Sequence, residues 1–160
     1  MHTVVNPCDR ILDHLYVGTE DAFNTDIKFN MLVNCTVDFE FPKYTNVNSN
    51  IRIPIDDSPY DCDNFIPFIK HSKVLDKIRQ KISDRHNVLV YCSDGNQRAC
   101  SLIACYIIKF LRLSPSFAIS FIKTRRPSAF RGDHYLLSSI EYFYVDLHAN
   151  KNKNYMPVVL

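Results

Sequence analysis

Glycine is scarce in this 160-residue sequence, which contains only Gly18, Gly95 and Gly132. Since glycine adopts backbone conformations that other residues avoid, each of the three is expected to mark a tight turn or a close approach of the chain. Long apolar runs are also lacking, and no uninterrupted stretch reaches the roughly 18 residues that a membrane-spanning helix needs. The N-terminal residues lack a basic start followed by an apolar core, so they do not resemble a secretory signal peptide.

A strong charge of either sign is absent too. The chain has 19 Lys and Arg against 17 Asp and Glu, a formal net charge of +2. This balance gives no indication of a nucleic-acid or membrane-surface partner, so any preference for anions must be local. Hydrophobic residues make up 46% of the chain, which is enough for one domain with a normal buried core.

Six cysteines are present, but the spacings that bind metal are not. No CxxC pair occurs and the six histidines are scattered, which argues against zinc and leaves no metal to propose. A disulfide framework is also disfavoured, because Cys35, Cys100 and Cys105 lie in apolar segments of a chain that is not small. Free thiols in a reducing compartment, the cytoplasm, fit better.

Short apolar runs, typical of strands, alternate along the chain with segments whose apolar residues recur at helical spacing. This pattern predicts a single α/β domain over residues 1–147, followed by a polar C-terminal tail at 148–160. Strands are expected around a turn within 11–18, at 31–36, at 51–55 near a sheet edge, and at 88–91. Helices are expected at 64–83, at 99–111, through 124 after the capping pair Ser114-Pro115, and at 133–147. Such alternation is typical of a mainly parallel central sheet with helices on both faces.

The segment Cys92-Ser93-Asp94-Gly95-Asn96-Gln97-Arg98 lies between the predicted strand at 88–91 and the apolar helix that follows. In open α/β sheets, ligands bind beyond the carboxyl ends of the strands, where this loop is expected. Successive backbone N–H groups of a tight loop, together with a helix start, form a site for an anion. Arg98 can grip two phosphate oxygens with its planar fork. The positive surroundings are expected to lower the pKa of Cys92 and make it a nucleophile.

A cysteine six positions before an arginine is by itself a weak pattern, and a buried cysteine at a strand end is usually structural. The strand before the loop, the glycine within it and the helix after it make the pattern more specific. These residues alone favour a nucleophile that attacks a phosphate ester only modestly over a structural cysteine.

Residues 88–98 resemble the signature of the cysteine-based protein tyrosine phosphatases, and other segments resemble their small dual-specificity branch in the same order. The resemblance covers about residues 8–147 and implies a single-domain tyrosine-phosphatase-like fold. Residues 27–34 and Asp38 look most like the poxvirus-type members, so a viral source is one interpretation. The matching segments outside the loop are Leu15-Tyr16-Val17-Gly18, Ile51 to Ser58, and Phe117 to Pro127.

The resemblance implies that Cys92 attacks phosphorus and forms phosphocysteine, without a cofactor. Asp57 takes the place of the general acid, which protonates the leaving oxygen and then activates water. Its neighbour Asp56 is interpreted as a cap of the turn before Pro59. The phosphate-binding residues implied by the resemblance are Ser93, Asp94, Gly95, Asn96, Gln97 and Arg98.

Two arginines beyond the loop receive different interpretations. Arg125 is expected to cap a helix C-terminus and to face water. For Arg126, next to Pro127, the resemblance makes a secondary substrate contact the interpretation.

The sequence departs from the family pattern beside the loop. Tyr91 replaces the usual His, whose hydrogen bonds help to set the thiolate; its hydroxyl could replace part of this function, or its ring could simply pack. Ala99 replaces the usual Ser or Thr that supports the departing thiolate, so slow breakdown of phosphocysteine is expected. Gly132 stands where Asn often supports the loop; either Asp133 or Arg131 substitutes for it, or nothing does. A catalytically weak or inactive phosphate-binding pseudophosphatase is therefore the main alternative to an active enzyme.

The predicted substrate is a protein carrying phosphotyrosine, phosphoserine or phosphothreonine, because the short branch that the chain resembles has a shallow cleft. An RNA 5′-phosphatase is a second alternative, weakly disfavoured by the near-neutral charge. Asp94 and the lack of lysine in the loop disfavour polyphosphoinositides. Tyr135 and Tyr142 are expected in the core, and the aromatic last helix could support a homodimer. No membrane partner is expected, and a viral protein would act in the host cytoplasm or the virion.

Overall fold

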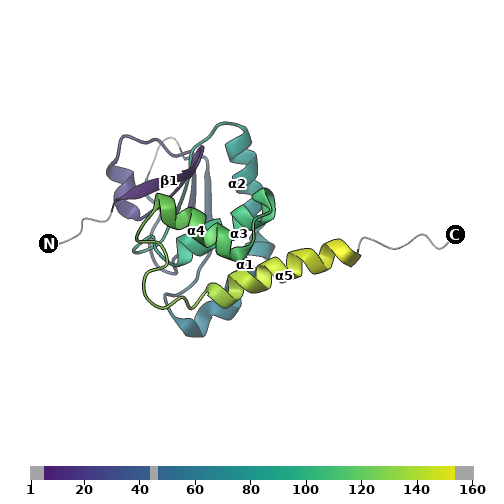
Figure 1. Ribbon diagram of the computed structural model, residues 1–160. Coiled ribbons are helices and arrows are strands. Elements are labelled where there is room, and N and C mark those ends of the chain that lie inside the picture. Colours follow the sequence, from purple (N-terminus) through teal and green to yellow (C-terminus); the bar gives the residue numbers. More distant parts are fainter. Residues whose placement is uncertain (1–5, 44–46, 154–160) are drawn as a thin grey trace.

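The computed structural model describes residues 6–43 and 47–153, which form a five-stranded sheet covered by helices (Figure 1). The strands lie in the order β1-β2-β5-β3-β4; β1 is antiparallel to β2 and the other neighbours are parallel. The mainly parallel sheet is therefore confirmed. The strands are β1 (Cys8–Leu12), β2 (Leu15–Gly18), β3 (Met31–Asn34), β4 (Ser49–Arg52) and β5 (Val88–Tyr91). The helices are η1 (Glu20–Asn24), η2 (Pro59–Asn64), α1 (Phe65–Ser72), α2 (Val74–Ser83), α3 (Arg98–Leu111), α4 (Pro115–Arg125) and α5 (Leu137–Lys153).

Strand β5 lies at the centre of the sheet, between β2 and β3. All four of its residues are fully buried, as expected for a parallel strand covered on both faces. Strand β4 lies at the sheet edge, which confirms the expectation for this part of the chain, although it begins at Ser49 and ends before Pro54. The loop that follows β5 is therefore anchored at the centre of the sheet.

The two faces of the sheet are covered unequally. The larger core contains Val88 and Val90 of β5 together with the buried side chains of all five α-helices. The smaller core, on the other face, contains Leu89 and Tyr91 of β5 and residues from η1 and the neighbouring loops. Helices were expected on both faces of the sheet. Among the described residues, the only helix that contributes to the core on the second face is the 3-10 helix η1.

The expected single helix over 64–83 is wrong, because the structure contains two helices that meet at Lys73. This residue adopts a left-handed conformation with φ 56°, which ends α1 and starts α2 in a new direction. The apolar residues on both sides still reach the larger core, among them Ile69 and Val74. The helical spacing of the apolar residues therefore continues across Lys73, although the helix itself is interrupted there.

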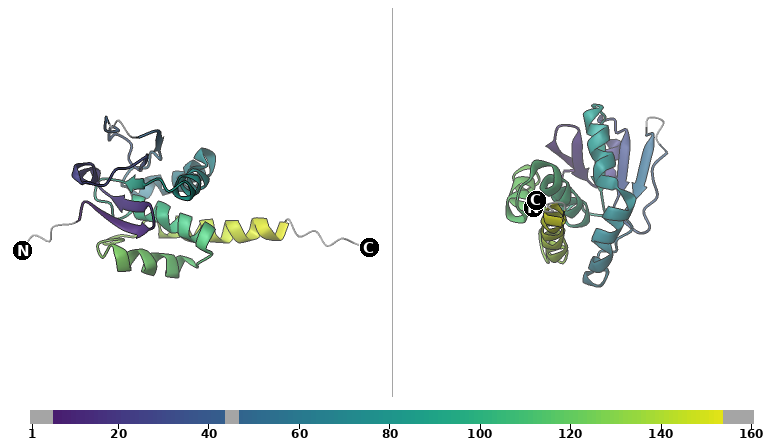
Figure 2. Two further views of the ribbon diagram at one scale, coloured as in Figure 1. Left: turned by 90° about the horizontal axis from the view of Figure 1, so that it is seen from above. Right: turned by 90° about the vertical axis from the view of Figure 1, so that its right-hand side faces the viewer.

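Helix α5 begins at Leu137 and continues through Lys153, so the expected helix at 133–147 starts too early and ends too soon. The part of the predicted tail at 148–153 is helical, and its remainder lies outside the described residues. The helix runs out beyond the sheet and the other helices (Figures 1 and 2). An ion pair between Lys70 of α1 and Asp146 holds it to the body. Among the described residues, no helix combines the length and the apolar character needed to cross a membrane.

Candidate active site

The loop at 92–97 joins the carboxyl end of β5 to the start of α3, as expected from the sequence. Cys92 is fully buried at the base of this loop, while the side chains of Ser93 and Asp94 are exposed. Ala99 and Gly95 direct their backbone N–H groups at the Cys92 sulfur. The start of α3 adds the positive end of its dipole. The arrangement can hold an anion directly above the thiol.

Two of the three glycines meet underneath the loop. Gly95 has φ +70°, and a Cβ at this position would lie 2.7 Å from both the Gly18 carbonyl oxygen and Arg126 Nη2. The same Gly18 carbonyl accepts a hydrogen bond from the Cys92 N–H, 3.3 Å away. Glycine is required here for both its conformation and its size. The end of β2 therefore serves as the floor of the loop.

Arg126 braces the loop from below and does not face a substrate. Its side chain is only 1% exposed. Nε donates to the Gly95 carbonyl at 3.0 Å and Nη2 to the Asp94 carbonyl at 3.1 Å. Nη1 donates to Asp9 Oδ2 at 2.8 Å and to the Asn6 carbonyl at 3.1 Å. The expectation of a secondary substrate contact at Arg126 is therefore wrong, because the guanidinium is buried and occupied. Arg125 is exposed and stacks on Phe121 of its own helix, 3.7 Å from the ring centroid.

The far side of the loop is held by residues 128–131. The Ser128 hydroxyl donates to Asn96 Oδ1 at 2.7 Å, and the Phe130 N–H donates to the Asn96 carbonyl at 2.9 Å. Gln97 Nε2 donates to the Arg131 carbonyl at 2.8 Å. Arg131 thus supports the loop through its backbone. These contacts provide the bracing that was expected from the region around Gly132.

Arg98 connects the loop to the segment that carries the candidate acid. Nη2 donates to Ser93 Oγ at 2.8 Å, and Nη1 donates to the Ile55 carbonyl at 2.9 Å. Asp57 follows Ile55 by two residues, so the guanidinium holds the acid-bearing segment beside the loop. The side chain is 5% exposed, which leaves its planar fork at the base of the site.

The two neighbouring carboxylates have different surroundings. Asp56 Oδ1 accepts the N–H of the next residue, Asp57, at 2.9 Å, whereas the cap of the helix that begins at Pro59 is Ser58, whose hydroxyl accepts the Tyr60 N–H. The Asp57 carboxylate instead accepts a hydrogen bond from the Tyr135 hydroxyl. Burial, followed by this carboxylate, raises the pKa of Tyr135, so its hydroxyl remains a donor at neutral pH. Tyr135 packs half-buried against the larger core, as expected, but it also lines the site, and no local signal marked that second role.

The resulting cleft has a volume of about 510 Å³. Its charged lining is three carboxylates and one guanidinium, and the Cys92 thiol lies buried beneath it. A dianionic ligand must therefore enter past negative groups before it reaches the loop and Arg98. The lining residues are Asp57, Pro59, Asp94, Gln97, Arg131, Asp133 and Tyr135.

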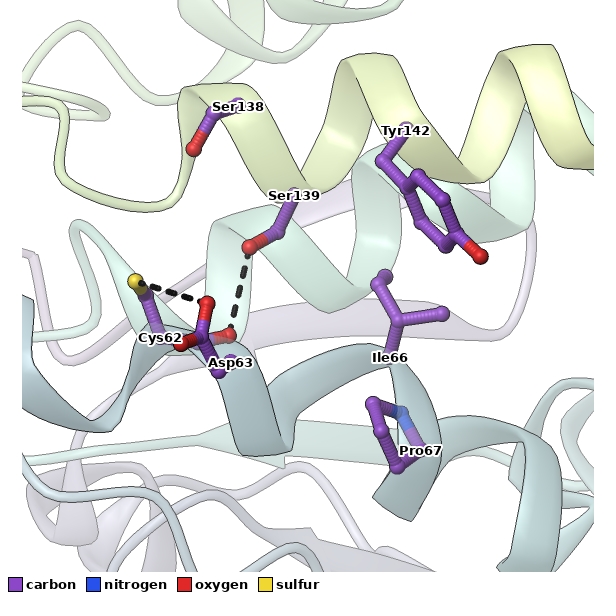
Figure 3. Close-up of a pocket in the computed structure, with 7 residues that line it drawn as sticks. All are labelled: Cys62, Asp63, Ile66, Pro67, Ser138, Ser139 and Tyr142. Atoms are coloured by element: carbon purple, nitrogen blue, oxygen red, sulfur yellow. Dashed lines mark hydrogen bonds between the residues drawn. The ribbon is translucent and has the colours of Figure 1, made fainter.

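A second pocket of about 390 Å³ lies between η2, α1 and α5 (Figure 3). The Ser139 hydroxyl donates to the Cys62 carbonyl at 3.3 Å and ties α5 to η2. Tyr142 stands at the rim and is 58% exposed, so its expected place in the core is wrong. Nothing in this pocket reaches the phosphate loop, and we assign it no chemistry.

Comparison with known proteins agrees with this geometry. Residues 15–144 match the family model described as dual specificity phosphatase, catalytic domain. The chain belongs to the dual specificity phosphatase family. Mouse dual specificity protein phosphatase 8 is 31% identical over 139 residues, which are 83% of this chain and 20% of that protein. The vaccinia virus dual specificity protein phosphatase OPG106 is 30% identical over 118 residues, 68% of this chain and 64% of that protein.

The fold is also that of known dual specificity phosphatases. Human DUSP28 has a TM-score of 0.78 at 20% identity, with 91% of this chain and 97% of that chain covered. The chain spans about a fifth of the length of the mammalian phosphatase 8. The similarity to OPG106 agrees with the resemblance to poxvirus-type members.

One departure from the family pattern is now explained by packing. The Tyr91 ring lies in the smaller core, edge-on to Phe23 with 5.2 Å between ring centroids, whereas Cys92 lies in the larger core. Adjacent residues of a strand point to opposite faces. Tyr91 is therefore a packing residue, and its hydroxyl does not take over the hydrogen bonds of the family histidine at the sulfur.

The expected lowering of the Cys92 pKa is wrong for this dual specificity phosphatase. Burial raises the pKa of the Cys92 thiol, and the Asp94 carboxylate raises it further. The Ala99 and Gly95 amides and Arg98 act in the opposite direction but do not offset the burial. The thiol form therefore predominates at neutral pH, which sets this loop apart from the reactive thiolate that its sequence suggested.

Proposed function

We propose that this chain is a cysteine-dependent phosphatase that hydrolyses phosphotyrosine, phosphoserine and phosphothreonine in proteins. The observation that carries the proposal is the arrangement of three groups about the phosphate loop. Cys92 lies under a loop of backbone N–H groups, Arg98 spans the loop, and Asp57 stands at its mouth. These groups supply a nucleophile, an anion clamp and a proton donor.

The reaction proceeds in two steps. The Cys92 sulfur, as thiolate, forms a bond to phosphorus while the bond to the leaving oxygen breaks, and Asp57 gives that oxygen its proton. Arg98 and the amides of residues 93–98 hold the other phosphate oxygens through both steps. Asp57, now ionised, takes a proton from water, whose oxygen attacks phosphorus and releases Cys92 and inorganic phosphate.

The charges in the cleft favour a phosphoprotein substrate over RNA 5′ ends and polyphosphoinositides. Besides the proton donor Asp57, the cleft is lined by two carboxylates, those of Asp94 and Asp133, and by one arginine, Arg131. RNA 5′ ends and polyphosphoinositides bring additional phosphates, which these carboxylates repel. A polypeptide carries a single phosphate and can place neutral or basic residues beside it. Membership in the dual specificity phosphatase family likewise favours an enzyme over a pseudophosphatase.

The proposal places the protein in a reducing compartment, the cytoplasm of the cell in which it acts. Cys92 must remain a free thiol to act as nucleophile. All six cysteines are unpaired in the structure, which fits that environment.

A burst experiment tests the proposed function. Rapid mixing of an aryl phosphate with the protein is expected to release one equivalent of the phenol, followed by slow steady turnover. Cys92→Ser is expected to lose turnover by at least about 10⁴-fold while it still binds tungstate. Cys62→Ser, a half-buried cysteine outside the cleft, is the control and should keep parental kinetics. Absence of both burst and turnover in the parent protein, with tungstate bound, would reject the enzyme and leave a phosphate-binding module.

A further inference from the structure

Asp94 places a carboxylate inside the phosphate loop. Its Oδ1 accepts the Asn96 N–H at 2.9 Å and also accepts the Cys92 thiol, whose sulfur is 3.7 Å away. We propose that Asp94 is an internal competitor of the substrate: its carboxylate occupies an amide that a phosphate would use, and its charge opposes both phosphate and thiolate. This inference rests on the proposed function and adds a residue that sets the affinity and rate of the same site.

The position of the carboxylate supports competition. The backbone N–H groups of a tight loop converge on one anion. Here the Asn96 N–H is already satisfied by an oxygen of the same loop. Asp94 is exposed and lines the cleft, so its side chain can turn outward when a phosphate arrives. The backbone of Asp94 is fixed by the Arg126 contact to its carbonyl, so only the side chain needs to move.

The charges around the sulfur point to the same role. The titratable groups that face Cys92 are Arg98 and Cys100 of α3, Cys35 after β3, Tyr135 and Asp94. The two neighbouring thiols and Tyr135 remain protonated at neutral pH, because burial raises their pKa values. The Asp94 carboxylate thus balances the Arg98 guanidinium while Cys92 is a neutral thiol. A thiolate or a phosphate dianion adds negative charge to a loop that is already balanced.

Two substitutions separate the charge of Asp94 from its occupation of the amide. Asp94→Asn keeps an oxygen that can accept the Asn96 N–H but removes the charge. Asp94→Ala removes both. Asp63→Asn, which changes an exposed carboxylate of the second pocket, is the matched control.

The first measurement is the rate of Cys92 alkylation by iodoacetamide as a function of pH, read from the mass of the Cys92 peptide. Only the thiolate reacts, so the midpoint reports thiol ionisation without any need for turnover. Both Asp94 variants are expected to shift the midpoint down by about one pH unit, which makes alkylation at pH 7 about tenfold faster. Asp63→Asn should keep the parental midpoint.

The second measurement is the affinity for inorganic phosphate, read from protection of Cys92 against the same alkylation. We expect about tenfold tighter binding in Asp94→Asn, and tighter binding still in Asp94→Ala, where the Asn96 amide is also free. The kcat/KM for an aryl phosphate at pH 7 should rise about tenfold in Asp94→Asn.

The inference and the proposed function fail in different ways. If Asp94→Asn keeps the alkylation midpoint and the phosphate affinity of the parent, the inference is overturned, whatever the turnover. A slower Asp94→Asn enzyme would also overturn it and would instead identify Asp94 as the proton acceptor for Cys92. A shifted midpoint and tighter phosphate binding in the Asp94 variants, together with no turnover in the parent protein, would support the inference and reject the proposed function.

Discussion

The underside and the open side of the phosphate loop are built on different principles. Below the loop, Gly95 packs against Gly18, and the buried Arg126 side chain donates to four acceptors. Above it, Asp57 and Asp94 are exposed, and the cleft that they line is rich in negative charge. The underside fixes the shape of the loop, while the open side controls what enters it and how fast it reacts. The contacts under the loop can therefore stay fixed while the side chains on its open side differ from those of the family.

This difference explains how the chain can depart from the family pattern without losing the family fold. Tyr91 packs into the smaller core and Ala99 into the larger one, and neither substitution touches the contacts under the loop. The departures are expected to change rates more than structure. Substitutions on the open side should therefore alter kinetics and leave stability intact, and substitutions on the underside should do the reverse.

The largest effect is expected at Asp57. Asp57→Asn removes the proton donor and should lower kcat for phosphotyrosine by about 10²- to 10⁴-fold. The loss should be smaller for an aryl phosphate with an acidic phenol, which leaves without protonation. The melting temperature should stay unchanged, because Asp57 is exposed. Asp56→Asn, which preserves the turn, is the control. Equal kinetics of Asp57→Asn and the parent would mean that another group is the acid.

Arg126→Met is expected to act on stability first. The change leaves the Asp9 carboxylate and the carbonyls of Gly95 and Asp94 without their buried donor. Loss of such a buried partner costs about 3–5 kcal/mol of unfolding free energy. Urea unfolding measures this change. Arg125→Met, one residue earlier and exposed, should lie within about 0.5 kcal/mol of the parent. Similar stability of the two variants would contradict a bracing role for Arg126.

Ala99→Ser should accelerate the second chemical step. A hydroxyl at this position can donate to the sulfur as it departs from phosphorus, as the resemblance to the family suggests. Steady-state kcat is expected to rise about tenfold, with an unchanged rate of the initial burst. Rapid-mixing kinetics separate the two phases. An increase in the burst rate alone would show that attack, and not release, is slow in this chain.

The smallest effect is expected at Tyr135. Tyr135→Phe removes the hydrogen bond to Asp57 and should lower kcat a few-fold, by less than Asp57→Asn.

The hydrogen bond between Tyr135 and Asp57 also affects the free energy of unfolding at high pH. The pKa of Tyr135 is raised in the folded state. Its contribution to the free energy of unfolding is therefore fully present below the ordinary tyrosine pKa of about 10, and it is lost as the pH rises further. The stability difference between parent and variant should therefore be constant near neutrality and shrink above about pH 10. A constant difference at all pH values would contradict this assignment.

The sequence was informative where local chemistry decides the structure. The apolar run at 88–91 became the central strand, and Ser114 caps α4 by accepting the Phe117 N–H. The loop between β5 and α3 also followed from neighbouring residues.

Other features depend on segments that meet only in the folded chain. The break at Lys73 carries no glycine or proline to announce it. Nothing local distinguishes the exposed Arg125 from the buried Arg126, because the partners of Arg126 lie in β1 and in the loop. The raised pKa of Cys92 likewise reflects burial by elements far away in sequence. Tyr135 reaches Asp57 across 78 positions.

The contacts of Arg126 also set the order in which the protein can be assembled. This residue bridges Asn6 and Asp9, which precede it by 120 and 117 positions, to a loop about thirty positions away. Contacts across such separations form late in folding, since the intervening chain must first be ordered. On the ribosome, residues 92–98 emerge well before residue 126 does. The nascent loop therefore has no brace, and its capacity to hold an oxyanion should arise abruptly, when the early and late parts of the chain meet.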